Sequence, residues 1–292
     1  MEKPARSHCF LPTNERGVHR YFTFSSIFGS SEKVPYLSAI GLTTSKIGEN
    51  ALNSMTSYNP QDRLIVALDV PDAQQALELV ARLGGTCRWF KVGMELYYAT
   101  GNAFVETLRK QGFQVFLDLK LHDIPNTVAG AVRSVTSAGA SLLTVHATGG
   151  PAMMAAAAEA ACAPGSPRLL AVTVLTSMDA AQLSAIGVSS SPADQVLRLT
   201  RLAQSVGIDG MVCSPEEVAT LRAETDPDTM LVIPGIRPAG SEVGDQKRIA
   251  TPGETIARGA SMLVVGRPIT RAPDPAAAAQ AILDEIAQTS NP

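Results

Sequence analysis

Residues 115–127 read Val-Phe-Leu-Asp-Leu-Lys-Leu-His-Asp-Ile-Pro-Asn-Thr, and this stretch indicates the fold class. Three apolar residues lead into an Asp-x-Lys-x-x-Asp triplet, and Pro125 then opens an Ala/Val-rich segment with helical character. Burying a carboxylate or an ammonium is costly unless it is paired. Acids and a base on one short turn therefore predict a mutually neutralising charge cluster at the end of a buried strand, which is typical of functional sites.

Apolar runs of the same kind recur along the chain from residue 60 onward. Continuous runs predict strands that are covered on both faces, and the Ala-rich, helix-like stretches between them predict parallel pairing. Eight strand-helix units in the remaining length of the chain are what a (β/α)8 TIM barrel requires. The runs are Leu64 to Leu68, Trp89 to Val92, Val115 to Leu119, Leu142 to Val145, Leu169 to Leu175, Gly210 to Cys213, Met230 to Ile233 and Met262 to Val265.

A doubly wound open sheet is the alternative that periodicity alone does not exclude. Two observations argue against it. No G-x-G-x-x-G follows the first run, and polar or special residues sit at the C-terminal end of nearly every run. In a barrel the C-terminal ends of all strands converge on one face, whereas in an open sheet they would lie in a row along one edge.

Composition narrows the class of protein. The chain has 292 residues and a net charge of -3, with 45% hydrophobic and only 17% charged residues, which suits a buried sheet under Ala-rich helices. It has no Lys/Arg block for nucleic acid and no apolar run of the roughly 20 residues that a membrane span needs. The scattered cysteines and histidines lack metal-ligand spacing, so we expect a small-molecule substrate, no metal and a reduced, cytoplasmic setting.

The first 59 residues differ from the rest, being Ser/Thr-rich with aromatic residues at no clear period. We expect residues 1–59 to form a poorly ordered extension and residues 60–292 to form the barrel domain. Acidic residues interrupt the extension, which argues against a transit peptide. Met55 is a possible true start of the folded protein, a hypothesis that N-terminal sequencing of the natively expressed protein would test.

Charged residues at the ends of three predicted strands are the first candidates for chemistry. Asp69 either belongs to the site or caps the following helix, although Asp72 competes for that role. Lys91 ends an apolar run and needs a counter-ion if buried, for which Asp118 and Asp123 are candidates; a surface lysine is the alternative.

The triplet itself has two interpretations. Alternation along a strand places Asp118 and Lys120 on the same side, while Asp123 lies beyond the strand end. This set is either catalytic or a structural ion-pair cluster. His122 is more typical of a loop-packing histidine, and for His146 lining the pocket and capping its strand remain equally open.

Two late loops carry a further set of candidates. A long Gly- and Pro-punctuated segment follows the seventh run, and Gly266-Arg267 follows the eighth. In TIM barrels the loops after strands seven and eight commonly bind phosphate, using backbone N–H groups and a cation. Arg237, Gln246, Gly266 and Arg267 form such a set.

Residues 60–288 closely resemble the orotidine 5′-phosphate decarboxylase family, with its motifs in the family's order. The first 59 residues have no counterpart in it. The matching elements are Leu-Asp at 68–69, Lys-Val-Gly at 91–93, Asp-Leu-Lys-Leu-His-Asp-Ile-Pro-Asn-Thr at 118–127, Val-His-Ala at 145–147, Leu-Thr-Ser at 175–177, Pro-Gly-Ile-Arg at 234–237, Gly-Asp-Gln at 244–246 and Val-Gly-Arg-Pro-Ile at 265–269.

The resemblance implies a homodimeric, cofactor-free TIM barrel that converts orotidine 5′-monophosphate to UMP and CO2. Lys91, Asp118 and Lys120 would form a charge array, completed by Asp123 from the partner subunit, with Lys120 protonating C6. The implied substrate contacts are Asp69 and Lys91 to ribose, Thr127 to ribose across the dimer, Thr176 and Ser177 to the pyrimidine, and Gln246, Gly266, Arg267 and Arg237 at the phosphate.

Two rivals share parts of this pattern. A magnesium-dependent sugar-phosphate decarboxylase or synthase of the same barrel group resembles the Asp-x-Lys-x-x-Asp core. A catalytically silent barrel that binds a phosphometabolite is the other. Retention of the four charges argues against the silent barrel, and the Gly-Asp-Gln element with Thr176-Ser177 favours the nucleotide enzyme.

Overall fold

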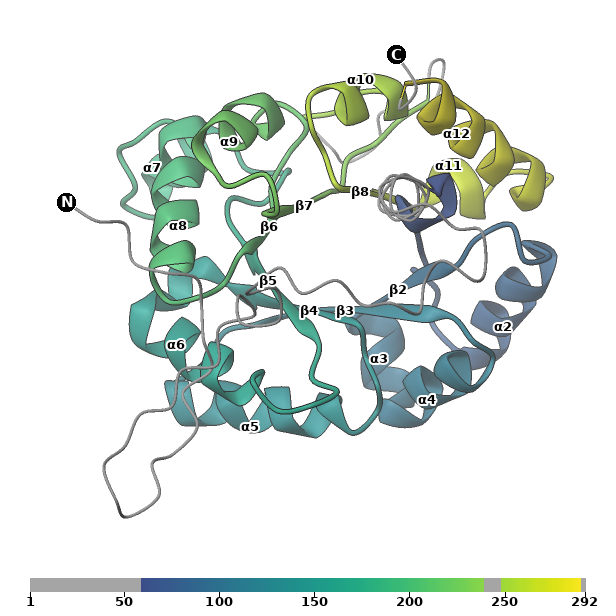
Figure 1. Ribbon diagram of the computed structural model, residues 1–292, viewed down its shortest axis with the longest axis horizontal. Coiled ribbons are helices and arrows are strands. Elements are labelled where there is room, and N and C mark those ends of the chain that lie inside the picture. Colours follow the sequence, from purple (N-terminus) through teal and green to yellow (C-terminus); the bar gives the residue numbers. More distant parts are fainter. Residues whose placement is uncertain (1–58, 239–247, 290–292) are drawn as a thin grey trace, which may run out of the picture. The chain divides into compact units, whose positions relative to one another are not determined.

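The computed structural model describes residues 59–238 and 248–289. Its eight parallel strands close into one barrel, in which neighbours along the chain pair and β8 returns to β1 (Figure 1). The predicted TIM barrel is confirmed, and the open sheet is excluded because every strand has a partner on both sides. Residues 1–58 of the predicted extension lie outside the described ranges. Among the described residues, no helix is long and apolar enough to cross a membrane.

Each of the eight predicted apolar runs contributes a strand. The structure shortens the fifth run, which ends at Val172, and lengthens the third, which continues to Leu121. The strands are β1 (Leu64–Ala67), β2 (Trp89–Gly93), β3 (Gln114–Leu121), β4 (Leu142–His146), β5 (Arg168–Val172), β6 (Gly210–Val212), β7 (Met230–Ile233) and β8 (Met262–Val265).

Helices surround the barrel, and α2, α7, α8 and α10 begin at a side chain that caps them. The Asp72 carboxylate accepts a hydrogen bond from the Gln75 N–H at the start of α2, and Thr251 with Glu254 forms a capping box on α10. The helices are α2 (Ala73–Arg82), α3 (Met94–Thr100), α4 (Asn102–Lys110), α5 (Pro125–Thr136), α6 (Gly150–Ala160), α7 (Ala180–Ala185), α8 (Pro192–Ser205), α9 (Val218–Glu224), α10 (Pro252–Ala257), α11 (Arg267–Thr270) and α12 (Pro275–Thr289), with short 3-10 turns η2 (Pro60–Asp62) and η3 (Ala147–Gly149).

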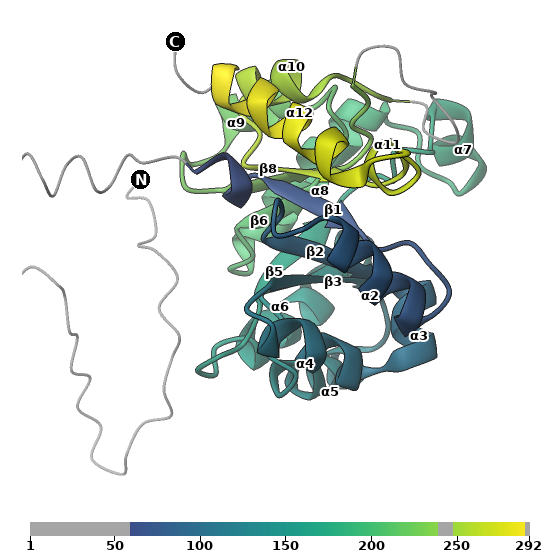
Figure 2. The same cartoon turned by 90° about the vertical axis from the view of Figure 1, so that its right-hand side faces the viewer.

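Side chains of each strand are buried on both faces, in two separate apolar layers. The outer layer lies between strands and helices, and Figure 2 shows α10, α11 and α12 grouped over β8 and β1. The inner layer fills the barrel, as expected for a fold whose interior is a packed core rather than a pore. The inner residues are Ile65, Ala67, Phe116, Leu142, Leu170, Val232, Met262 and Val264.

Candidate active site

A cavity of about 440 Å³ opens where the C-terminal ends of the strands converge. Ala67, Phe116 and Val264 of the inner core contribute to its lining, so the top of the packed barrel interior borders the cavity. Most residues predicted for the site lie around it. They are Asp69, Lys91, Asp118, Lys120, Thr176, Ser177, Arg237, Gly266 and Arg267.

Asp69 and Lys91 form the first ion pair of this cavity. The Lys91 Nζ lies 2.7 Å from Oδ1 of Asp69. Asp69 is available for this contact because Asp72, three residues later, caps α2 in its place. The interpretation of Asp69 as a helix cap is therefore wrong. Lys91 is only 8% exposed, so the surface-lysine alternative is wrong as well.

Asp118 lies between two lysines. Its Oδ2 is 3.6 Å from the Lys91 Nζ, and its Oδ1 is 2.8 Å from the Lys120 Nζ. Asp69, Lys91, Asp118 and Lys120 therefore form a chain of alternating charge across the ends of β1, β2 and β3. Of the two counter-ions predicted for Lys91, Asp118 is one. Asp69 takes the second place, and among the described residues no ion pair joins Lys91 to Asp123.

The charged states of this chain follow from its pairing. Burial alone would lower the pKa of Lys91, but Asp118 and Asp69 outweigh it, and the pKa lies above its usual value. Burial alone would raise the pKa of Asp118, but Lys91 and Lys120 outweigh it, and the pKa lies below its usual value. Both groups are therefore ionised at neutral pH, and the cavity carries fixed charges of both signs.

The backbone at Lys120 departs from a regular strand. Its φ of 49° lies in the left-handed region, which residues other than glycine seldom adopt. The pairing of β3 with β4 shifts register between Leu117 and Leu121, as at a β-bulge. The side chains of Asp118 and Lys120 meet as predicted, but a bulge rather than regular alternation brings them together.

Thr144 of β4 supports this bulge and was missed by the sequence analysis. Its side chain is fully buried, and its Oγ1 accepts a hydrogen bond from the Lys120 N–H at 2.8 Å. The same hydroxyl donates to Oδ1 of Asp118 at 3.2 Å. The available signal was a lone hydroxyl inside the apolar run that ends at Val145.

Gly93, at the end of β2, leaves room for the first ion pair. A Cβ at this position would lie 3.0 Å from the Lys91 Nζ and 3.3 Å from Oδ1 of Asp69. Any other residue here would crowd the lysine and the carboxylate at once. The glycine of the Lys-Val-Gly element therefore has a steric role beside the charges.

Loops after β5, β7 and β8 complete the lining. Thr176 and Ser177 follow β5, and Gly266 and Arg267 follow β8. Arg237 follows β7, is buried, and its backbone N–H donates to the Ala250 carbonyl oxygen at 3.0 Å.

Two further residues on α11 and just after it were not predicted. Thr270 and Arg271 line the cavity together with Arg267. This side of the cavity therefore carries one more arginine than the predicted Gly266-Arg267 element supplies. Gln246, which was predicted to join this set, lies outside the described residues.

Comparison with known proteins identifies the family of this chain. The model of the orotidine 5′-phosphate decarboxylase / HUMPS family matches residues 62–282. The chain belongs to this family. It is 54% identical to the orotidine 5′-phosphate decarboxylase of Afipia carboxidovorans over 234 residues, 80% of this chain and 98% of that protein. The enzyme of the same name from Halorhodospira halophila is 54% identical over 77% of this chain and 96% of its own length.

Solved structures give the same result for the fold. The crystal structure of orotidine 5′-phosphate decarboxylase from Lactobacillus acidophilus superimposes with a TM-score of 0.69 at 41% identity, covering 77% of this chain and 99% of that one. The predicted membership of the orotidine 5′-phosphate decarboxylase family is therefore confirmed.

The segment that follows β3, residues 122–127, does not line the cavity. Residues 122–127 are all exposed, and neither Asp123 nor Thr127 belongs to the described lining. Oδ1 of Asp123 accepts a hydrogen bond from the Ile124 N–H at 2.6 Å, and Ile124 itself is 67% exposed. The structure does not bring Asp123 and Thr127 to the other predicted site residues of the same chain.

The two histidines among the described residues pack against each other. The rings of His122 and His146 stack with centroids 5.3 Å apart, and Nδ1 of His146 lies 2.7 Å from the Thr148 hydroxyl. Burial, and then the nearby His122 and Lys120, lower the pKa of His146. Neither histidine is among the described residues that line the cavity.

Proposed function

We propose that this chain decarboxylates orotidine 5′-monophosphate to UMP and CO2, with Lys120 as the proton donor to C6. The observation that carries the proposal is the chain of alternating charge from Asp69 to Lys120, which lines a cavity at the barrel mouth. The names of relatives that are 54% identical over nearly their whole length support the same reaction.

The chemistry needs positive charge beside C6 before the reaction begins. Breaking the bond from C6 to the carboxylate releases CO2 and leaves an electron pair on C6, which the pyrimidine ring stabilises poorly. A preorganised ammonium lowers the energy of this carbanion, because no reorganisation is needed as the charge develops. Lys120, which Asp118 holds in place, supplies that charge and then transfers an N–H proton to C6, giving UMP. Asp118 would lie beside the departing carboxylate.

The remaining cavity residues bind the rest of the nucleotide in this proposal. Phosphate contacts are remote from C6, so their binding energy can favour a closed, reactive arrangement rather than only tighten binding. The proposed contacts are Asp69 and Lys91 to the ribose hydroxyls, Thr176 and Ser177 to the pyrimidine edge, and Arg237, Gln246, Gly266 and Arg267 to or beside the phosphate.

The decisive experiment follows orotidine 5′-monophosphate absorbance with purified protein in the presence of EDTA. We expect turnover without added metal, since both carboxylates near the reaction centre are already engaged by lysines. The family also includes the HUMPS branch, so metal-dependent turnover of a sugar phosphate would favour that alternative. No turnover of either substrate would favour the silent barrel.

We also propose a homodimer that shares its active sites. Asp123 and Thr127 lie outside the cavity of their own chain, on an exposed segment with Ile124. Tyr98 and Met94 of α3 are likewise exposed, at 79% and 43%, and exposed apolar side chains favour an interface.

Mixed variants test this sharing. Lys120→Ala and Asp123→Ala proteins should each be inactive, whereas co-refolding them should restore about a quarter of wild-type activity, because half the dimers regain one of two sites. No recovery from a verified mixed dimer would contradict shared sites.

Two further proposals concern the whole chain. We propose that residues 60–292 form the decarboxylase domain and that residues 1–59 are an extension dispensable for catalysis, as the family match from residue 62 supports. Protein starting at Met55 should keep full turnover. The cytoplasm is the proposed location, which fractionation of expressing cells would test.

A further inference from the structure

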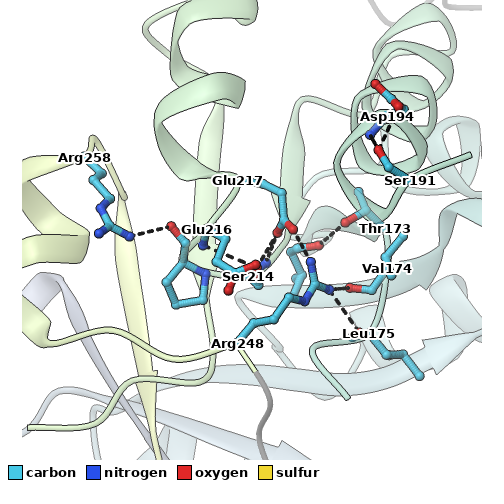
Figure 3. A network of polar contacts seen from close by, with 12 residues as sticks. Thr173, Val174, Leu175, Ser191, Asp194, Ser214, Glu216, Glu217, Arg248 and Arg258 are labelled. Carbon is cyan, nitrogen blue, oxygen red and sulfur yellow. Dashed lines mark hydrogen bonds and ion pairs between the residues drawn. The ribbon is translucent and has the colours of Figure 1, made fainter. Parts of the chain in front are cut away.

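A second buried ion pair, formed by Arg248 and Glu217, lies outside the chain of alternating charge. The Arg248 guanidinium contacts Oε1 of Glu217 through Nη1, and the two residues are 7% and 5% exposed (Figure 3). Oε2 of Glu217 accepts hydrogen bonds from the Ser214 N–H, at 2.9 Å, and from the Ser214 hydroxyl. The carboxylate is therefore satisfied by two separate partners, one on each oxygen.

The second terminal nitrogen of this arginine, Nη2, contacts the loop after β5. Its Nη2 donates to the Leu175 carbonyl oxygen at 3.1 Å and lies 3.5 Å from that of Val174 (Figure 3). Val174 and Leu175 line the cavity and directly precede Thr176 and Ser177, which would contact the pyrimidine.

Arg248 also lies close to the backbone that holds Arg237. Residues 236 and 250 form an isolated parallel bridge, and the Arg237 N–H donates to the Ala250 carbonyl oxygen. Arg237 lines the same cavity. One arginine thus connects the loop after β5, the loop after β6 through Glu217 and Ser214, and the chain returning from the loop after β7.

Stability of the folded protein does not by itself explain why Arg248 and Glu217 form a buried ion pair. Replacing a buried ion pair by apolar groups of similar volume is often neutral or stabilising, because desolvation of the charges is costly. What an apolar pair cannot supply is a donor to the backbone of a loop that borders the active site. Arginine fits this task better than lysine, because its planar fork holds several acceptors in fixed directions.

We propose that Arg248 is a positioning residue, which holds the loop bearing Thr176 and Ser177 at a fixed distance from Arg237. The inference rests on the proposed function, in which those residues contact the pyrimidine and the phosphate end of one nucleotide. Without Arg248, the loop after β5 loses its side-chain donor to Leu175. Thr176 and Ser177 are then no longer held in position to contact the pyrimidine ring.

The test compares two ligands, one with a ring and one without. In Arg248→Met/Glu217→Gln, both charges are gone, while the glutamine can still accept from Ser214. We expect the Kd for UMP, measured by calorimetry, to rise about tenfold, the value of one hydrogen bond. The Kd for ribose 5-phosphate should stay within about twofold of wild type, because the ring-contacting loop does not touch it. The KM for orotidine 5′-monophosphate should rise together with the Kd for UMP.

Arg258→Met is the matched control. Arg258 donates to the Pro215 carbonyl oxygen at 3.3 Å on the loop after β6, and the described contacts do not join it to residues 174 or 175. It should leave both dissociation constants unchanged. Equal loss of both ligands in the double variant, or no loss of UMP, would overturn the inference. Because binding is measured directly, absent turnover by the wild type would count against the decarboxylase assignment while the ligand comparison still tests Arg248.

Discussion

Replacing Thr144 by valine keeps the shape of a fully buried side chain and removes its hydroxyl. Two hydrogen bonds are lost, one to the ionised Asp118 and one from the Lys120 backbone N–H. A hydrogen bond to a charged group contributes about 1.5–3 kcal/mol, and an unsatisfied N–H costs about 1 kcal/mol or more. Both contacts are only partly buried, so we expect the free energy of unfolding to fall by about 2 kcal/mol.

Activity should fall as well as stability, because the hydroxyl that is lost accepts the hydrogen bond from the Lys120 N–H, where the backbone is left-handed. A displacement of about 1 Å can cost on the order of 100-fold in rate, so we expect kcat to fall between about 10- and 100-fold. The measurements are urea unfolding and kcat at saturating orotidine 5′-monophosphate.

Two variants control for the valine. Thr144→Ser keeps the hydroxyl and should retain most of kcat. Thr200→Val changes another fully buried threonine, whose hydroxyl has no hydrogen-bond partner among the described residues, and should be neutral or stabilising. A Thr144→Val protein with wild-type kcat, or a serine variant as impaired as the valine, would refute the reasoning.

Three further predictions concern the cavity. Gly93→Ala places a Cβ 3.0 Å from the Lys91 Nζ, so KM should rise and a crystal structure should show the ammonium displaced; an unmoved lysine would contradict the steric role. Arg267→Ala should raise KM and lower kcat, and wild-type kinetics would count against a phosphate contact. The pKa of Asp118 is lowered and that of Lys91 is raised, so their stabilisation should be lost only below pH 3.8 and above pH 10.5. Urea unfolding of wild type and of Asp118→Asn/Lys91→Met should differ by a constant amount between about pH 5 and pH 9.

The barrel was predictable because its strands are buried on both faces. Strands of this kind consist of consecutive apolar residues, which can be recognised in the sequence of each strand alone. Strand ends were less predictable. The third run was expected to stop at Leu119, yet β3 continues through a bulge to Leu121, because pairing with β4 resumes there. Such a register shift depends on the neighbouring strand, so it cannot be predicted from the residues of β3 alone.

The charged site residues were predictable for a different reason, since an ion at the end of an apolar run requires a partner. Which partner it finds depends on register. Ala67 pairs with Lys91 across β1 and β2, and this register brings Asp69, two residues later, to the lysine. Thr144 and Arg248 were missed because their partners lie 24 to 74 positions away in the sequence.

Among the described residues, the hydrogen-bonded networks around Asp118 and around Arg248 lie in different halves of the barrel. Asp69, Lys91, Asp118, Lys120 and Thr144 all belong to β1 to β4 or to the residues that follow them. The Arg248 network joins only the loops after β5, β6 and β7. The chain of alternating charge and the loops that bear Thr176, Ser177 and Arg237 are thus held by contacts in separate halves of the barrel. A chimera that exchanges the second half for that of another TIM barrel should change its ligand preferences, while the ion pairs from Asp69 to Lys120 stay assembled.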